Sequence, residues 1–195
     1  FEYGDDPLFS ATGRYGLSDR ITLEGHAEGS RGIAQAGIGG VMRLGERGGV
    51  VNASLAGSRG NDLAGHQYGL GYQWNSRVLS VSLNTLRRSA EFRDVASLLE
   101  GADLPRRTDQ AFIGVSTSLG QWGMSYITQD YPVVGLSRYA SLNWSRSLPG
   151  NSLLSLSVNR DLENDTGSSA FLYWSMPLDR MTSVSAALRH TDNAG

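Results

Sequence analysis

The sequence is divided by compact turns that recur at a nearly constant interval. Their centres lie near Asp19, Glu46, Asn75, Gly120, Gly150 and Asp179. Four of the five gaps between them are about 27 to 30 residues, which fits two strands of about ten residues, one tight turn and one looser loop. A tilted strand of about 9 to 11 residues is long enough to cross a bilayer. The interval therefore predicts one β-hairpin that is repeated along the chain.

The residues between the turns alternate between two kinds of side chain. One series is apolar or aromatic and carries no charge, as in Val51, Ala53 and Leu55, and the residues between its members are mostly small or polar. Because successive side chains of a strand point to opposite faces, the pattern predicts an all-β chain of about twelve antiparallel strands in an up-and-down meander. A charge facing lipid at the midplane costs about 2 to 4 kcal/mol, so the uncharged series favours a partial transmembrane β-barrel.

The polar series is the candidate functional surface. It is dominated by Ser, Asn, Gln and Gly, whereas the water-exposed strand faces of soluble proteins tend to carry Lys, Glu and Thr. This composition suits a water-filled lumen. The predicted pore-lining residues are Glu24, His26, Glu28, Asn52, Ser54, Gln67, Gln73, Ser80, Ser82, Asn84, Ser141, Asn143, Ser155, Ser157 and Asn159. Four apolar residues depart from the pattern: Phe112, Ile127, Phe171 and Tyr173.

Looser connections are expected between the tight turns. They are Gly29 to Ile33, Arg59 to Gly65, Ser89 to Arg107, Asp130 to Leu136 and Glu163 to Ser168. Bacterial barrels keep short turns in the periplasm and longer loops outside the cell, so this alternation predicts a topology. Within the longest connection, Val95 to Glu100 is expected to form a helical turn that ends at Gly101.

Aromatic residues gather near the predicted strand ends, where interfacial girdles of membrane barrels lie. They are Tyr15, Trp74, Trp122, Trp144 and Trp174. All 17 basic residues are arginines, and five of them lie in or beside the longest connection: Arg87, Arg88, Arg93, Arg106 and Arg107. Guanidinium groups pair bidentately with phosphate, so these five could contact lipopolysaccharide. The alternative is a solvated loop whose charges only keep it wet.

Several classes of chemistry find no support in the sequence. A net charge of -2 without a basic stripe argues against nucleic acid as a partner. Cysteine is absent, and His26, His66 and His190 are too far apart for a ligand cluster, so neither a cofactor nor a metal is expected. No nucleophile elbow or phosphate loop occurs, and the glycines at 37, 39 and 40 lie within a strand pattern. An enzyme is therefore not predicted.

The run from Pro7 to Gly25, which reads PLFSATGRYGLSDRITLEG, resembles the barrel of fimbrial outer-membrane ushers just after the plug domain. The glycines near Gly37, the Tyr68 to Tyr72 strand and the segment from Asp130 to Trp144 also resemble ushers. The resemblance implies a pore, usually of 24 strands, in the Gram-negative outer membrane. Such a pore receives pilus subunits from a periplasmic chaperone and secretes the fibre. Residues 1–195 would form about half of that wall, as an internal piece of a longer chain.

The sequence is also compatible with two other classes of protein. Another outer-membrane barrel, such as a porin or a surface enzyme, has the same alternation and also contacts outer-membrane lipid. A soluble β-sandwich binding module alternates in the same way, with its apolar series buried between two sheets. The sandwich would bury Val81, Leu156 and Leu172 against one another across the two sheets.

Overall fold

The computed structural model describes residues 7–30, 32–60, 63–95, 103–163, 167–178 and 182–192. The strands are β1 (Phe9–Ser18), β2 (Ile21–Ser30), β3 (Ile33–Arg43), β4 (Val50–Gly60), β5 (Leu63–Asn75), β6 (Leu79–Arg88), β7 (Arg107–Thr117), β8 (Gly120–Tyr131), β9 (Gly135–Leu148), β10 (Ser152–Asp161), β11 (Ser168–Pro177) and β12 (Ser183–Thr191). A 3-10 helix, η1 (Pro149–Asn151), joins β9 to β10. No helix among the described residues is long and apolar enough to cross a membrane.

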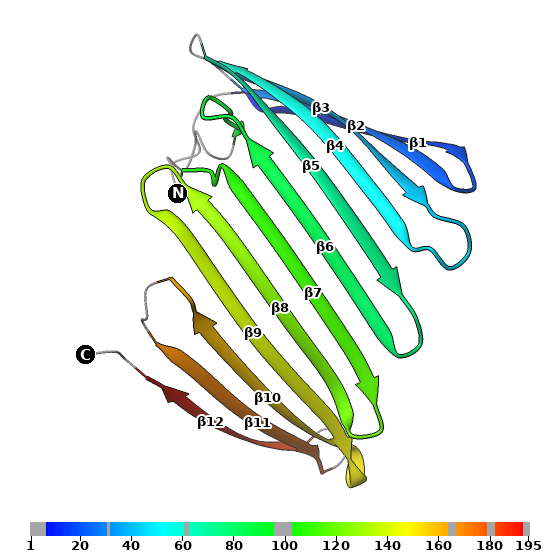
Figure 1. Ribbon diagram of the computed structural model, residues 1–195, viewed down its shortest axis with the longest axis vertical. Helices are drawn as coiled ribbons and strands as arrows, with labels where there is room; N and C mark the ends of the chain where they lie inside the picture. Colours follow the sequence, from blue (N-terminus) through cyan, green and yellow to red (C-terminus); the bar gives the residue numbers. More distant parts are fainter. Residues whose placement is uncertain are drawn as a thin grey trace. The chain divides into compact units, whose positions relative to one another are not determined.

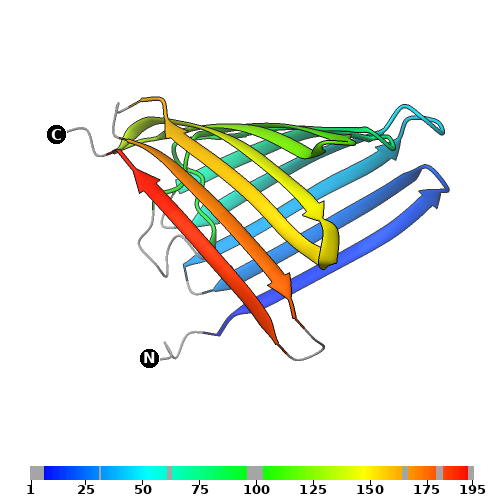
Figure 2. The same cartoon turned by 90° about the horizontal axis from the view of Figure 1, so that it is seen from below.

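The twelve strands form one sheet in which they are ordered as in the sequence, from β1 to β12. Neighbouring strands are antiparallel wherever their register is defined, from β1 to β5 and from β9 to β12. Figure 1 shows the strands of each hairpin side by side, and Figure 2 shows the antiparallel course of the last four strands. The prediction of an all-β meander of about twelve strands is confirmed.

The chain divides into two compact units. Unit 1 contains the described residues of 7–74, 83–109 and 129–135, and unit 2 contains those of 75–82, 110–128 and 136–192.

The tight turns lie where the sequence predicts them, and local hydrogen bonds close them. In the turn between β5 and β6, Ser76 N donates to Leu79 O at 2.7 Å and Ser76 Oγ accepts from Leu79 N at 2.9 Å. Between β3 and β4, Gly48 N donates to Leu44 O at 2.9 Å. The predicted turn at Asp179 falls on positions 179–181, which lie outside the described residues.

Three of the connections that the sequence predicts to be loose are in fact short. β2 ends at Ser30 and β3 begins at Ile33, while β4 ends at Gly60 and β5 begins at Leu63. The strand pairing continues to the ends, since Ser30 pairs with Ile33 and Gly60 pairs with Leu63. Between β8 and β9 only positions 132–134 lie outside the strands. The expected alternation of short turns and long loops is therefore wrong. The connection between β6 and β7 is the longest one, and it sets the two ends of the strands apart.

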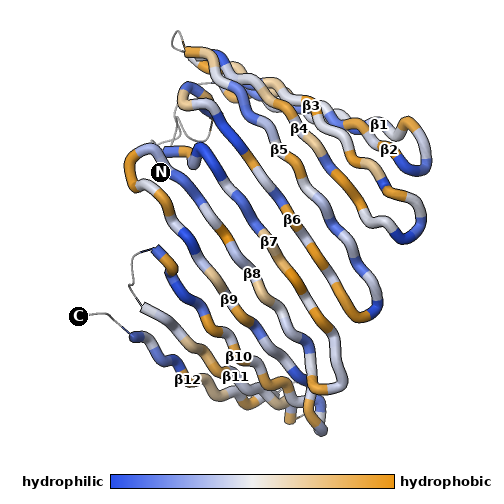
Figure 3. The backbone as a smooth tube through the Cα atoms, in the orientation of Figure 1, coloured by the Kyte–Doolittle hydropathy of each residue, from blue (hydrophilic) through white to orange (hydrophobic). Residues whose placement is uncertain are grey.

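The apolar series covers one face of each unit and is largely exposed. Ile38 of unit 1 is 69% exposed and Leu188 of unit 2 is 71% exposed. The buried hydrophobic side chains of the described residues are Ile33, Phe92 and Val95. Figure 3 shows the alternation of hydrophobic and hydrophilic residues along the strands. So small a buried set is unlike the core of a soluble domain of this size.

The sandwich alternative does not fit this architecture. It needs two stacked sheets, whereas the described strands form a single sheet. Leu156 and Leu172 are cross-strand neighbours on β10 and β11 rather than partners across two layers, and Leu172 remains 37% exposed.

Aromatic side chains on the apolar face bind the turns of neighbouring hairpins. In unit 1, Trp74 Nε1 donates to Arg47 O at 2.6 Å and Tyr72 Oη donates to Gly48 O at 3.0 Å. In unit 2, Trp144 Nε1 donates to Leu119 O at 3.1 Å, and its ring lies 5.9 Å from that of Trp122. Trp74, Trp122 and Trp144 therefore lie at the turn ends of their strands, where the sequence predicts them.

We expect Trp74→Phe to lower the free energy of unfolding by about 1 kcal/mol, because it removes one hydrogen bond and keeps an aromatic ring. The measurement is the denaturant midpoint of the detergent-solubilised protein. Leu70→Met, on the same strand and face, is the control and should leave the midpoint nearly unchanged. Equal midpoints for Trp74→Phe and the wild type would mean that the indole contact does not stabilise the turn.

Candidate functional site

The predicted pore-lining residues of unit 1 share one face of its strands. Glu24 on β2 stands opposite Gly39 on β3, which stands opposite Ser54 on β4. Ala56 on β4 stands opposite Gln67 on β5. The other members of this face are Glu28 opposite Gln35, His26 opposite Gly37, Asn52 opposite Gly71, and Gln73 opposite Val50. A Cβ atom on Gly71 would lie 2.6 Å from the amide groups of both Asn52 and Asn84, so Asn84 joins the same surface. We call this surface the polar face of unit 1.

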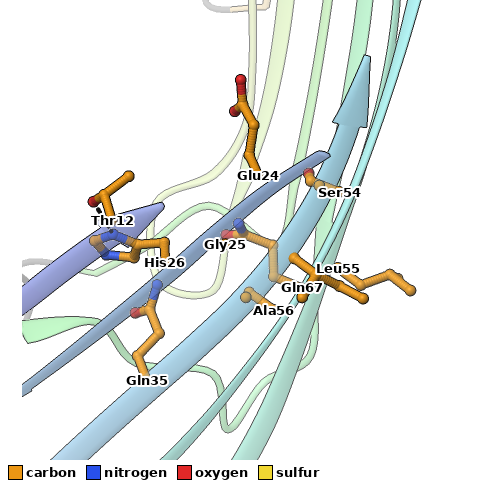
Figure 4. A pocket seen from close by; sticks show the side chains of 12 residues that line it. Thr12, Glu24, Gly25, His26, Gln35, Ser54, Leu55, Ala56 and Gln67 are labelled. Carbon is orange, nitrogen blue, oxygen red and sulfur yellow. Dashed lines mark hydrogen bonds between the residues drawn. The ribbon is translucent and has the colours of Figure 1, made fainter. Parts of the chain in front are cut away.

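Charged residues gather on the polar face at β1 and β2. Arg14 Nη2 lies 2.5 Å from Glu24 Oε1. His26 contacts Thr12 Oγ1 at 3.1 Å through Nδ1 and Glu28 Oε2 at 3.3 Å through Nε2. Figure 4 shows Thr12 and His26 pointing toward each other, with Glu24 directed away from them. The side chains are partly exposed, with 37% for Glu24 and 23% for Glu28, so the ion pairs are solvated and contribute little to stability.

A hollow of about 220 Å³ lies beside this cluster, where β3 carries glycine at positions 37 and 39. Its lining includes Glu24, His26, Gln35 and Gln67. The Oε1 atom of Gln35 is buried and has no hydrogen-bond partner within the part of the chain that the structure describes. The lining of the hollow therefore carries carboxylate and amide oxygens that can accept hydrogen bonds.

The predicted residues of unit 2 also share a face. Ser125 and Ser141 are joined by a hydrogen bond of 2.5 Å between their hydroxyl groups. The register places Asn143 opposite Ser157, Ser145 opposite Ser155, and Ser141 opposite Asn159. Ser80 Oγ donates to Gly114 O at 3.5 Å, and one hollow is lined by Ser80, Asn143, Ser155 and Ser157 together. Ser82 follows Ser80 on the same side of β6 by strand alternation.

Aromatic departures from the polar pattern also lie on the polar face of unit 2. Phe171 and Tyr173 are stacked at 6.3 Å, opposite Ser157 and Ser155 on β10. Phe112 lines the same hollow as Ser80. The face is consequently hydroxyl-rich with isolated aromatic rings rather than uniformly polar.

A segment that sequence reasoning missed lies on the polar face of unit 1. Phe92 is 1% exposed, and a Cβ atom on Gly65 would collide with the backbone of Phe92. Arg93 N donates to Ser58 Oγ at 3.0 Å, and Ser89 N donates to His66 O at 2.9 Å. Ser58 and Gly65 face each other across β4 and β5 on the polar side. The start of the β6–β7 connection therefore folds onto the polar face instead of extending away as a solvated loop.

Four of the five arginines near this connection have side-chain contacts, and their surroundings differ. Arg88 Nε donates to Gln67 Oε1 at 2.6 Å and Nη1 donates to Pro105 O at 3.0 Å, on the polar face. Arg93 Nη1 donates to Ala90 O and Phe92 O, within the folded segment. Arg87 and Arg107 lie on the apolar face. The predicted helical turn at Val95 to Glu100 extends into positions 96–102, which lie outside the described residues.

No group of three or more His, Asp or Glu side chains that could hold a metal occurs in the described ranges. His26, His66 and His190 lie on three separate strands, β2, β5 and β12.

The fold and its faces define the class of protein that this chain resembles. Twelve antiparallel strands in a single meander, with one exposed apolar face and one polar face, have the construction of an outer-membrane barrel wall. No protein-family model and no curated protein matches the chain. Among solved structures, it is similar to the "Structure of the P pilus usher (PapC) translocation pore", with a TM-score of 0.67 and 16% sequence identity. The likeness covers 95% of this chain and 42% of that chain, and at this identity it concerns the fold alone.

We expect Gly65→Ala to displace the segment from Ser89 to Val95, because the added methyl group occupies the space of the Phe92 backbone. The displacement should break the hydrogen bond from Arg93 N to Ser58 Oγ and speed amide hydrogen exchange at Phe92 and Arg93.

Gly13→Ala is the matched control, since no heavy atom lies within 4 Å of a Cβ atom at Gly13. Unchanged exchange in the Gly65→Ala protein would contradict the close packing of the segment on β5.

Proposed function

We propose that this chain is part of the wall of an outer-membrane usher, a pore that secretes pilus subunits delivered by a periplasmic chaperone. The observation that carries the proposal is the separation of the two faces along every strand, on a fold similar to the P pilus usher pore. The apolar face suits hydrocarbon, with Arg87, Arg107 and Asp109 confined to the strand ends, and the polar face suits a lumen filled with water. In this role the wall binds no cofactor and catalyses no reaction.

The polar face would allow passage of a folded subunit because it offers little apolar surface for the subunit to bind. Ser, Asn, Gln and Gly offer hydrogen bonds to water and no broad apolar patch on which a folded subunit would stick. The hydroxyl and amide side chains of Ser80, Asn143 and Ser157 line one hollow of this face together. A folded subunit can therefore slide along the wall without being retained.

A wall of twelve strands requires further strands to complete it. β1 and β12 stand at the two ends of the strand order, and unpaired backbone groups in hydrocarbon cost several kcal/mol each. The chain spans 42% of the P pilus usher chain that it resembles. We propose that residues 1–195 form about half of a closed barrel and that the other strands pair with β1 and β12.

The membrane assignment is tested by fractionation and gel migration. Expressed together with the strands that complete its barrel, the chain should need detergent for extraction and should migrate differently on a gel before and after boiling, because a closed sheet resists detergent until heated. A soluble protein in the absence of detergent, with one migration position, would contradict the proposal.

The role of the polar face is tested by the triple variant Ser82→Leu, Ser141→Leu and Ser157→Leu, which places three apolar side chains along the proposed lumen. We expect fibre secretion to fall about tenfold or more, since each fully buried leucine contact between wall and subunit is worth about 1.5 to 3 kcal/mol. The measurement is the amount of assembled pilus on the cell surface, at equal amounts of folded barrel.

The matched control places the same three side chains on the opposite face, as Ala111→Leu, Ala140→Leu and Ala186→Leu. These positions belong to the apolar series, so secretion should stay at the wild-type level. Unchanged secretion by the serine variant would refute the sliding-wall mechanism.

A further inference from the structure

Two arginines and one aspartate form a cluster on the apolar face of unit 1, at the ends of β6 and β7 that flank the long connection. Arg87 Nη1 and Nη2 donate to the two carboxylate oxygens of Asp109, at 2.7 and 3.3 Å. Arg107 Nε donates to Asp109 Oδ2 at 2.6 Å, and Thr85 Oγ1 donates to Oδ1 at 2.6 Å. Asp109 therefore holds two guanidinium groups next to each other. We call these residues the Arg87–Arg107 cluster.

The strand register explains why the two arginines meet. Arg88 N donates to Arg106 O at 2.8 Å, so Arg87 on β6 stands opposite Arg107 on β7. Two like charges directly opposite each other are unfavourable on a sheet unless something compensates them. Asp109 supplies one negative charge for the two positive charges. The cluster therefore keeps a surplus positive charge.

The wider charge balance at this end of the apolar face is also positive. Among the described strand residues of unit 1, Arg59 on β4 belongs by alternation to the same series as Arg87 and Arg107, and Asp130 on β8 joins Asp109 as the second acidic residue of that series. At this end of the face, the described part of unit 1 thus sets three arginines against two aspartates. The Arg107 side chain is 53% exposed and that of Arg87 is 29% exposed, so both can reach an anion outside the sheet. Figure 3 shows these ends of β6 and β7 as hydrophilic.

The cluster adjoins apolar surface. On the same face and toward the turn end, Tyr68 is 44% exposed, Leu70 is 53% exposed and Leu83 is 46% exposed. Ser89 N donates to His66 O, which places Arg87 opposite Tyr68 on β5. A ligand that fits both parts must carry an anionic head and long apolar chains. A free anion would use only the arginines.

We propose that Arg87 and Arg107 bind a phosphate of the lipid headgroups in the outer leaflet, with the acyl chains of that lipid lying against Tyr68, Leu70 and Leu83. The chemistry is that of lipid A, which carries phosphate on a multiply acylated sugar. Asp109 accepts from Nη1 and Nη2 of Arg87 and from Nε of Arg107. The Nη1–Nη2 edge of Arg107 can therefore match two phosphate oxygens, and Arg87 adds its positive charge beside it. The site rests on the proposed function, because the apolar face must contact lipid.

The placement of the long connection at this end of the strands is consistent with the outer leaflet, since the long loops of bacterial barrels lie outside the cell. Arg88 and Arg93 take no part, because they bind Gln67 and loop carbonyls on the other side of the sheet. The site thus selects two of the five arginines near the connection.

The experiment measures binding of bisphosphorylated lipid A to the detergent-purified protein by native mass spectrometry. The test variant is Arg87→Gln with Arg107→Gln, and the control is Arg146→Gln, on the apolar series of β9 near its turn end. We expect lipid A to bind the double variant about tenfold more weakly than the wild type or Arg146→Gln, from the loss of charge-assisted hydrogen bonds. Arg107→Gln alone keeps the Arg87–Asp109 pair and serves if the double variant does not fold.

Two further ligands separate the headgroup from the chains. Lipid A stripped of both phosphates should bind the wild type no more tightly than intact lipid A binds the double variant. Inorganic phosphate at the same concentration as lipid A should not displace lipid A from the wild type. Equal binding of lipid A to wild type and double variant, or full competition by inorganic phosphate, would overturn the lipid site. If that happens while the protein still shows heat-modifiable migration, only the lipid site fails. A protein that stays in buffer without detergent would overturn both proposals.

Discussion

Backbone pairing between neighbouring strands is the constraint on which the rest of this structure depends. The side chains provide little internal burial, since Ile33, Phe92 and Val95 are the buried hydrophobic residues of the described chain. Instead, hydrogen bonds between neighbouring strands, from β1 to β12, satisfy the backbone N–H and C=O groups. Where water is absent, only such pairing keeps a strand in place. Because the backbone hydrogen bonds do not depend on the side chains, the residues of each face can match the surroundings of that face. One face can therefore be apolar while the other is polar.

The fold was predictable because its signals are local. Alternation along Val51, Ala53 and Leu55 reports the strand and its faces, and turn residues such as Asn75 report the hairpins. The same signals overestimated the connections at the other end of the strands. Gly and Ser at strand ends look like loop residues, yet Ser30 and Gly60 continue the ladder as paired residues. Composition alone does not reveal where pairing stops.

The candidate surface was predictable to the extent that it follows strand parity. The residues selected from the sequence do share a face within each unit, as the pairing of Asn143 with Ser157 illustrates. The folded segment around Phe92 was not predictable, because its contacts with Ser58 and Gly65 join residues far apart in the sequence. A glycine on the polar side of β5 and a lone phenylalanine in a polar connection were the only signals. Parity could also have separated Arg87 from Arg88, since adjacent residues of a strand point to opposite sides.

The indole contacts at the turn end give the order of assembly a physical basis. Trp74 on β5 reaches the turn between β3 and β4, and Trp144 on β9 reaches the turn between β7 and β8. Each contact can form only after the next strand has joined the hairpin whose turn it holds. If the strands join the sheet in sequence order, each arriving strand of this kind adds a hydrogen bond to the turn of the preceding hairpin. That bond opposes dissociation of the hairpin from the sheet.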